Sequence, residues 1–105
     1  MKLLTVVVPC YNSEDYMKVS IDSLLIDDRI EVIIINDGSS DKTAEIADAY
    51  VLEYPEQVQV IHKENGGHGS AIDAGLALAT GAYFKVLDSD DWLNETSLKA
   101  VLEYI

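Results

Sequence analysis

Short runs of apolar, mostly β-branched residues alternate along this chain with longer segments whose apolar positions have helical spacing. Each short run is followed by polar or glycine-rich residues, so we expect four strands, at residues 3–8, 31–35, 57–61 and 83–87. Between them we expect helices at residues 15–25, 42–54 and 70–79. This alternation predicts right-handed crossovers and an α/β fold, a mostly parallel sheet with helices on both faces.

The ends of these elements carry their own signals. Ser13, Asp41 and Ser70 are candidate N-caps for the three helices, and Pro55 and Gly81 are stop signals after the second and third. A fourth helix should follow Asn94, with an apolar stripe at Leu98, Val101, Leu102 and Ile105. Because this stripe meets no C-cap, we expect residues 1–105 to be the N-terminal part of a longer domain.

Charge narrows the classes of partner. Nineteen acidic against seven basic residues give a net charge of −12, which repels phosphate backbones, so nucleic acid is not an expected partner. An anionic ligand would need a bridging cation or a nest of backbone N–H groups. The single Cys10 excludes an internal disulfide and suits a reducing cytoplasm, and without a cationic neighbour it is a small hydrophobe rather than a nucleophile.

The apolar run at residues 3–8 is too short to span a bilayer, and we find no targeting signal in the sequence. We therefore expect a cytoplasmic protein. Association with the cytoplasmic face of a membrane stays open through regions outside this chain.

Polar residues cluster just after each expected strand. In open parallel sheets, ligands bind beyond the carboxyl ends of the strands, so these loops should form one site. The four loops are residues 9–12, 36–41, 65–70 and 88–91.

The fourth loop has the sharpest chemistry. Asp88 and Asp90 stand two residues apart just past a strand, where an extended backbone points both carboxylates the same way and a turn can splay them. Paired hard oxygen ligands suit Mg²⁺ or Mn²⁺, which is typically completed by water and substrate phosphates. The alternative is an Asp/Ser turn that caps the last helix.

In the second loop, Asp37 is placed to accept the imide N–H of a uracil ring, whereas Ser40 and Asp41 fit an ordinary strand-to-helix turn. In the first loop, Pro9 should end the strand. The ring of Tyr11 either lies against a flat base or is buried in a tight loop.

The glycine-rich third loop leads into a helix whose first N–H groups could receive phosphate or ribose oxygens. It is not the dinucleotide fingerprint, because it follows the third strand and has Ile72 at the last glycine position. His68 is either a ligand contact or a loop residue, and His62 is structural by its place at a strand end. Trp92 reads as a packing anchor, with the lining of a sugar pocket as the alternative.

Together these motifs resemble glycosyltransferase family 2, whose GT-A fold has a Rossmann-like nucleotide-binding half. The likeness covers nearly the whole chain, and its specificity lies in the order and spacing of four motifs. These are residues 6–12 (VVVPCYN), 35–43 (INDGSSDKT), 65–69 (NGGHG) and 88–92 (DSDDW).

The resemblance implies an inverting enzyme whose donor is a nucleotide-diphosphate sugar, most often uridine-linked, and whose acceptor is a saccharide or lipid-linked molecule in polysaccharide synthesis. It implies that Asp37 recognises the base, Asp88 contacts ribose or sugar, and Asp90, with Asp88 beside it, binds Mn²⁺ or Mg²⁺ at the diphosphate. The remaining donor-site residues implied are Pro9, Tyr11, Asn12, Glu14, Gly67, Ser70 and Ser89.

Two departures from the family pattern matter. Ile72 and Asp73 stand where many relatives have arginine and asparagine, so a cationic contact to the diphosphate is missing. The acceptor site and the general base belong to the second half of the family domain. We therefore expect residues 1–105 to be the donor-binding part, without a catalytic residue and inactive in transfer by itself.

Two other classes remain as alternatives: an aspartate-dependent phosphotransfer enzyme, and a receiver-like or other nucleotide-binding module without catalysis. The phosphotransfer class places its Asp-x-Asp pair after the first strand, and a receiver needs acidic residues there too. In this chain that position holds residues 9–12, none of which is acidic.

Overall fold

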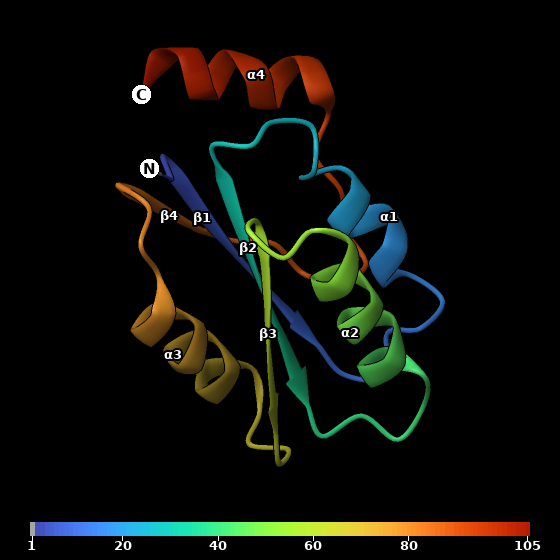
Figure 1. Cartoon of the computed structure of the whole chain (residues 1–105). Helices are drawn as coiled ribbons and strands as arrows, with labels where there is room; N and C mark the ends of the chain where they lie inside the picture. The colour runs from blue at the N-terminus through green and yellow to red at the C-terminus, as the bar shows by residue number, and fades with distance from the viewer. Residues whose placement is uncertain (1) are drawn as a thin grey trace.

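A computed structural model describes residues 2–105, in which four strands alternate with four helices (Figure 1). The elements are β1 Leu4–Cys10, α1 Met17–Asp22, β2 Ile30–Asp37, α2 Thr43–Glu53, β3 Val58–Lys63, α3 His68–Leu78, β4 Tyr83–Val86 and α4 Glu95–Tyr104. The strands form one sheet in the order β3-β2-β1-β4, and every neighbouring pair is parallel. The α/β prediction is therefore confirmed, with a sheet that is parallel throughout the described chain.

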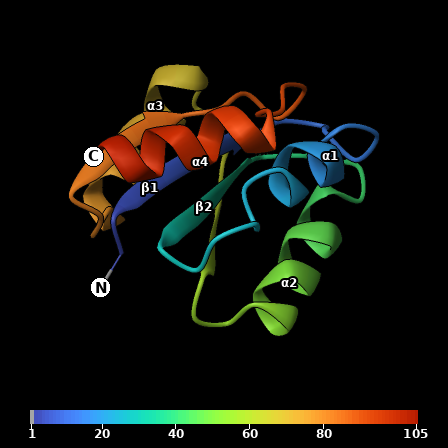
Figure 2. The same ribbon diagram turned by 90° about the horizontal axis from the view of Figure 1, so that it is seen from above.

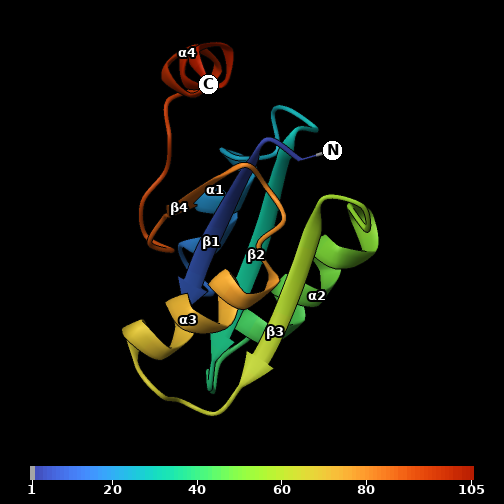
Figure 3. The same ribbon diagram turned by 90° about the vertical axis from the view of Figure 1, so that its left-hand side faces the viewer.

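Helices cover both faces of the sheet, as predicted. Helix α3 lies on one face, where Ala71 packs with Val7, Ile33 and Ile35 (Figure 3). Helices α1 and α2 lie on the other face (Figure 2), and α1, α2 and α4 all contribute side chains to the larger core. Strands β1 and β2 are buried almost throughout, because they lie inside the sheet with neighbours on both sides.

Helix α3 approaches β1 closely because Gly75 has no side chain. A Cβ at this position would lie 2.5 Å from Val7 Cγ2, well inside van der Waals contact. Val7 is fully buried and cannot move aside without disturbing the core. Gly75 therefore sets the distance between this helix and the sheet.

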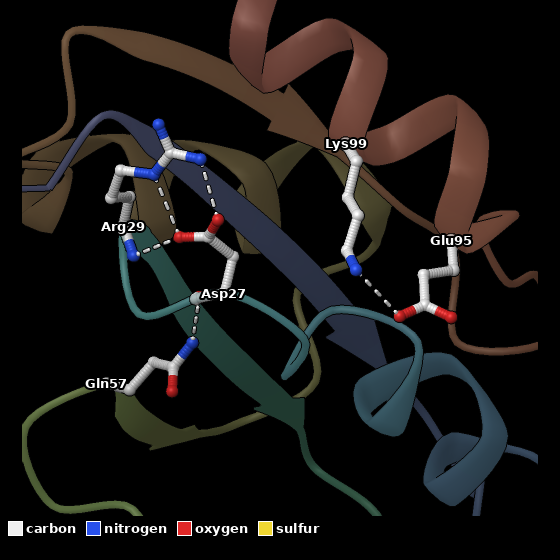
Figure 4. A network of polar contacts seen from close by, with 5 residues as sticks. All are labelled: Asp27, Arg29, Gln57, Glu95 and Lys99. Atoms are coloured by element: carbon white, nitrogen blue, oxygen red, sulfur yellow. Dashed lines mark hydrogen bonds and ion pairs between the residues drawn. The ribbon is translucent and has the colours of Figure 1, made fainter.

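The turn from α1 into β2 is held by a compact polar network (Figure 4). Arg29 donates from Nε to Asp27 Oδ1 at 3.0 Å and from Nη2 to Oδ2 at 2.7 Å, and Gln57 Nε2 donates to the Asp27 carbonyl at 2.7 Å. The hydrogen bonds from Arg29 lower the pKa of Asp27 to about 2. Beside this turn, Lys99 and Glu95 form a surface ion pair of 3.3 Å along α4.

The buried carboxylate of Glu31 joins three segments of the chain near the amino end of the sheet. Glu31 accepts hydrogen bonds from Thr5 Oγ1 at 2.9 Å and from Thr80 N and Oγ1 at 3.0 and 2.8 Å. Gln59 Nε2 adds a fourth donor at 3.3 Å. These bonds fasten the segment that enters β4 to the two central strands.

Strands β1, β2 and β3 run further toward their carboxyl ends than predicted, whereas β4 ends one residue earlier, at Val86. Pro9 lies inside β1, so the prediction that it ends the strand is wrong. The backbone nitrogen of Pro9 points toward the β4 side, where Val7 O accepts a hydrogen bond from Leu87 N at 2.9 Å. Strand β4 ends at Val86, which pairs with Val7, so Pro9 lies beyond the paired part of β4. No ladder hydrogen bond is lost, which is why proline is tolerated. Likewise β2 continues to Asp37, since β3 pairs with it up to that residue.

Two predicted N-caps are wrong. Helix α1 begins only at Met17, and the Ser13 hydroxyl contacts Ser89 Oγ and the backbone of Tyr11 instead of capping this helix. Helix α3 begins at His68, before Ser70. Asp41 precedes α2 and accepts from Thr43 N at 2.9 Å, as a capping carboxylate does. Asn94 is the N-cap of α4, where its Oδ1 accepts from Ser97 N at 3.1 Å.

The predicted stripe of α4 packs through Leu98 and Leu102, whereas Val101 is exposed. Helix α1 is shorter than predicted, since Leu24 N and Leu25 N bond three residues back and so tighten the chain after Asp22. Among residues 2–105, no helix has the length and apolar character needed to span a bilayer.

Candidate functional site

The carboxyl ends of the strands meet at one edge of the sheet, because all four strands are parallel (Figure 1). A small cavity of about 110 Å³ opens there. Its lining comes from β1 and the residue after it, from the end of β2, and from the first turns of α3: Pro9, Cys10, Tyr11, Asp37, His68 and Ala71.

Asp37, the last residue of β2, is the charged group of this cavity and is only 5% exposed. Its Oδ1 accepts from Lys63 Nζ and from Gly66 N, both at 2.9 Å, and its Oδ2 accepts from Gly67 N at 3.1 Å. Burial by itself raises the pKa of Asp37, but these hydrogen bonds outweigh it and leave the pKa below its usual value. The carboxylate is therefore ionised at neutral pH.

The opposite wall of the cavity is less polar. The ring of Tyr11 is 56% exposed, so the alternative of a buried aromatic is wrong and the ring is available to a ligand. Cys10 is buried, and burial raises the pKa of its thiol to about 12. The thiol is thus a neutral, buried part of the wall, which agrees with the interpretation of Cys10 as a small hydrophobe.

The first and second loops are bound to each other by side-chain hydrogen bonds to backbone. Asn12, in the left-handed conformation with φ 47°, accepts from Ser40 N at 2.8 Å and donates its own N–H to Ser39 Oγ at 3.0 Å. Glu14 Oε2 accepts from Lys42 N at 3.2 Å, and Glu14 N donates to Asp41 Oδ2 at 3.1 Å. In the described structure, Asn12 and Glu14 therefore shape the loops.

The first loop is also joined to the fourth. Ser13 Oγ lies 2.7 Å from Ser89 Oγ, and Ser13 N donates to Thr43 Oγ1 at 2.8 Å. On the other side of the acidic turn, Ser20 Oγ donates to the Asp88 carbonyl at 3.4 Å. The acidic turn is thus held by Ser13, in the loop after β1, and by Ser20, in α1. Ser13 is not among the site residues predicted from the sequence.

The carboxylates of the fourth loop form one exposed cluster. One ligand atom each from Asp88, Asp90 and Asp91 lies within 4.8 Å of the others. Asp91 is not among the predicted ligands, but Asp91 N donates to Asp88 O at 3.0 Å and closes a turn that brings the two residues together. This turn is separate from the cap of α4, which is Asn94, so the capping alternative is wrong.

The cluster fits a divalent cation of the Mg²⁺ or Mn²⁺ type. All its ligand atoms are carboxylate oxygens, the donors that such ions prefer. Their exposure leaves coordination places for water and for phosphate oxygens. Asp88, Asp90 and Asp91 are the residues that would hold the ion.

His68 lies between the cavity and the acidic cluster. It lines the cavity as the first residue of α3, and its Nε2 lies 3.7 Å from Asp88 Oδ1. A ligand that occupied the cavity and reached the acidic cluster would therefore pass this side chain. Of its two predicted readings, the geometry favours a ligand contact.

The remaining residues singled out in the sequence have different places in the structure. Gly67 takes part through its N–H, which Asp37 binds, whereas Ser70 is a half-buried residue of α3 outside the cavity lining. His62 is structural as predicted, since its ring nitrogens contact Asn36 Nδ2 at 3.0 Å and Asp48 Oδ1 at 2.8 Å. Trp92 is 66% exposed, so the prediction of a packing anchor is wrong.

The model of the family described as glycosyl transferase family 2 matches residues 5–105. Glycosyltransferase GlyG of Streptococcus pneumoniae is 35% identical over 107 residues, which cover 99% of this chain and 35% of that protein. The uncharacterized glycosyltransferase EpsJ of Bacillus subtilis is 38% identical over 96% of this chain and 30% of its own length. The chain thus spans about a third of the length of these two relatives.

Solved structures have the same fold. Residues 1–349 of TarS from S. aureus, in complex with UDP-GlcNAc, align over the whole of this chain and 31% of that TarS chain, with a TM-score of 0.86 and 32% identity. The mannosyltransferase PcManGT from Pyrobaculum calidifontis aligns over 94% of this chain and 31% of its own, with a TM-score of 0.81. At 24% identity, this second likeness supports the fold alone.

Proposed function

This chain belongs to glycosyltransferase family 2, and from that premise we propose that it supplies the donor and metal site of an inverting glycosyltransferase. The donor is a nucleotide-diphosphate sugar, linked to uridine. The acceptor is a saccharide or a lipid-linked molecule, and the reaction serves polysaccharide synthesis.

One observation carries the proposal: the cavity at Asp37 and the carboxylate cluster at Asp88 share one edge of the sheet, with His68 in contact with both. A nucleotide-diphosphate sugar has matching parts in the same order, a flat base, a ribose and a diphosphate. The base enters the cavity against Tyr11 and donates its imide N–H to Asp37. The diphosphate then lies toward the acidic cluster.

A metal at the cluster resolves a problem of charge, because a protein with a net charge of −12 otherwise repels a diphosphate. We propose Asp90, Asp88 and Asp91 as its ligands, and Mn²⁺ or Mg²⁺ as the ion. When bound, the ion neutralises negative charge on the leaving diphosphate. The chain's own residues bind the base, orient the ribose and keep the acidic turn in place through Ser89.

The uridine assignment has support from the TarS complex with UDP-GlcNAc, because that protein is 32% identical over the full chain. Pro9 and Asn12 belong to the base region by their loop, and Glu14 acts there by holding the second loop. Gly67 contributes through Asp37. Ser70 completes the proposed set from the first turns of α3.

We further propose that the acceptor site and the general base lie outside residues 1–105, so that the chain alone binds donor without transferring sugar. A cytoplasmic location suits the nucleotide-sugar donor, and membrane association would come through other regions. The phosphotransfer and receiver-like alternatives gain no support, because the aspartates follow β4, and β1 is followed by Tyr11 and Asn12.

The test is calorimetric titration of UDP into the purified chain with and without Mn²⁺, repeated with Asp90→Ala and Asp37→Ala. We expect Mn²⁺-dependent binding, which Asp90→Ala abolishes, because the cluster loses a ligand that no neighbour replaces. Asp37→Ala should weaken binding about tenfold or more, the usual effect of removing a charged hydrogen-bond partner.

The control is Asp28→Ala, which removes the same charge from an exposed position at the amino end of the sheet. It should bind UDP like the unchanged chain. If the folded chain fails to bind UDP under both conditions, the donor-site proposal is wrong. Robust sugar transfer by the chain alone would refute the proposal that the general base lies elsewhere.

A further inference from the structure

We propose that Lys63 is a positioning residue of the donor site, which orients the Asp37 carboxylate so that one acceptor place is left for a ring N–H of the base. Lys63 is thereby a determinant of which nucleobase the site accepts. The inference rests on the proposed function, since it assigns a cause to the base recognition proposed for Asp37.

The contact between the two residues is close and largely shielded from water. Lys63 Nζ lies 2.9 Å from Asp37 Oδ1, and the two side chains are 21% and 7% exposed. The last residues of β2 and β3 bring them together, because Asp37 pairs with Lys63 in the parallel register. An ion pair with this little exposure is weakly screened and restricts the carboxylate more than a surface pair does.

The ammonium group is itself held in place. Lys63 Nζ also donates to the Glu64 carbonyl at 2.8 Å. The third loop leaves room for it, since a Cβ at Gly66 would lie 2.9 Å from this Nζ. The loop therefore combines a glycine N–H that binds Asp37 with the space that the lysine needs.

The number of acceptor places on Asp37 is limited. An ionised carboxylate offers about four lone-pair directions on its two oxygens. Lys63 and Gly66 N occupy Oδ1, and Gly67 N occupies one place on Oδ2. One place on Oδ2 is left for a ligand, on a residue that lines the cavity.

An acceptor of this kind distinguishes bases by chemistry. Uracil presents a ring N–H between two carbonyl groups and can donate to the carboxylate. The corresponding ring nitrogen of cytosine is an acceptor, so two electron-rich atoms would face each other and the buried charge would lack its partner. Without Lys63, the carboxylate is free to turn away, and this distinction should weaken.

The experiment compares the binding of UDP and CDP in the presence of Mn²⁺ by calorimetry. The variants are Lys63→Met, which keeps the length of the stem, and Lys63→Arg, which keeps the charge. Lys85→Met, at an exposed position of β4, is the matched control for loss of one lysine charge. Circular dichroism and thermal unfolding report whether each variant folds.

We expect the unchanged chain to prefer UDP over CDP by at least about tenfold, because the wrong base leaves a buried polar group unpaired. In Lys63→Met the UDP affinity should fall about tenfold and the ratio of UDP to CDP affinity should approach one. Lys63→Arg should retain most of the ratio, and Lys85→Met all of it.

Two results would overturn the inference, and they are distinguishable. If the unchanged chain does not bind UDP, the proposed function fails and the role of Lys63 with it. If Lys63→Met leaves the ratio unchanged, with or without an equal loss of both affinities, Lys63 is only structural and the proposed function stands. Should Lys63→Met fail to fold, Lys63→Ala, which also removes the donor, decides by the same ratio.

Discussion

The hydroxyl groups of Ser13 and Ser89 lie 2.7 Å apart although 76 residues separate them in the chain. Ser13 follows β1 and Ser89 follows β4, and these two strands are neighbours in the sheet. The contact therefore ties the loop beside the base cavity to the turn that holds the carboxylate cluster. It links the two halves of the proposed donor site.

Replacing Ser13 should therefore disturb metal-dependent binding more than its distance from the carboxylates suggests. We expect Ser13→Ala to lower the UDP affinity a few-fold in the presence of Mn²⁺ and to reduce the free energy of unfolding by about 1 kcal/mol, the usual contribution of one hydrogen bond. Ser40→Ala is the control, since its hydroxyl is exposed and makes a long bond of 3.4 Å. Equal effects of both variants on UDP affinity would contradict the prediction.

Asp91 should act as a third carboxylate of the metal cluster. We expect Asp91→Asn to weaken Mn²⁺ binding by the chain about tenfold, because an amide oxygen carries no charge to offset the ion. Asp28→Asn removes the same charge at the far end of the sheet and should leave Mn²⁺ binding unchanged. Titration of Mn²⁺ in the presence of UDP measures both. If Asp91→Asn binds Mn²⁺ like the unchanged chain, the ion is held by Asp88 and Asp90 alone.

Gly75→Ala should destabilise the fold. Alanine favours a helix over glycine by about 1 kcal/mol, but its Cβ would lie 2.5 Å from Val7 Cγ2, and overpacking of a core costs about 1–3 kcal/mol. The cost of overpacking should exceed the gain in helix propensity, because Val7 is fully buried. In Gly69→Ala, in the first turn of the same helix, a Cβ meets no atom within 4 Å, so urea unfolding should show no loss of stability there.

The fold should lose stability as the pH falls below about 4. Hydrogen bonds lower the pKa of both Asp37 and Asp41 in the folded state, although burial alone would raise both. At a pH between the folded-state pKa and the unfolded-state pKa of about 3.9, the unfolded chain binds more protons than the folded chain. The free energy of unfolding therefore rises with pH in this range, and the contribution of these carboxylates is fully present above the unfolded-state pKa. Asp41→Asn should flatten this acid limb, measured as the free energy of unfolding between about pH 2 and 6.

Asp28→Asn again controls for the loss of one charge. An acid limb that Asp41→Asn leaves unchanged would mean that the hydrogen bonds from Thr43 and Glu14 do not stabilise the folded carboxylate.

Cys10 should be unreactive while the chain is folded. Burial raises the pKa of its thiol to about 12, so almost none is ionised at neutral pH, and its side chain is also out of reach of reagents. A thiol reagent that reacts by disulfide exchange should label the chain slowly in buffer and rapidly in urea. Rapid labelling in buffer, at a rate that urea does not increase, would contradict the buried position at the end of β1.

Local patterns in the sequence determined the fold class. Apolar β-branched runs and helical spacing are properties of neighbouring residues, so they revealed four strands, the alternation with helices and the parallel sheet. Parallel strands end at one edge, and this alone predicted that the loops around Tyr11, Asp37 and Asp88 would meet.

Only the tertiary structure decided which side chains touch within that edge. The pairing of Asp37 with Lys63 depends on the register between β2 and β3, and the contact of Ser13 with Ser89 depends on how two loops pack. The turn that brings Asp91 back to Asp88 is one of two backbone geometries that the sequence allowed there, and it adds a third carboxylate to the cluster. Such contacts join residues far apart in the chain or reverse its direction, and their geometry is set by packing, which a local pattern of residue types does not encode.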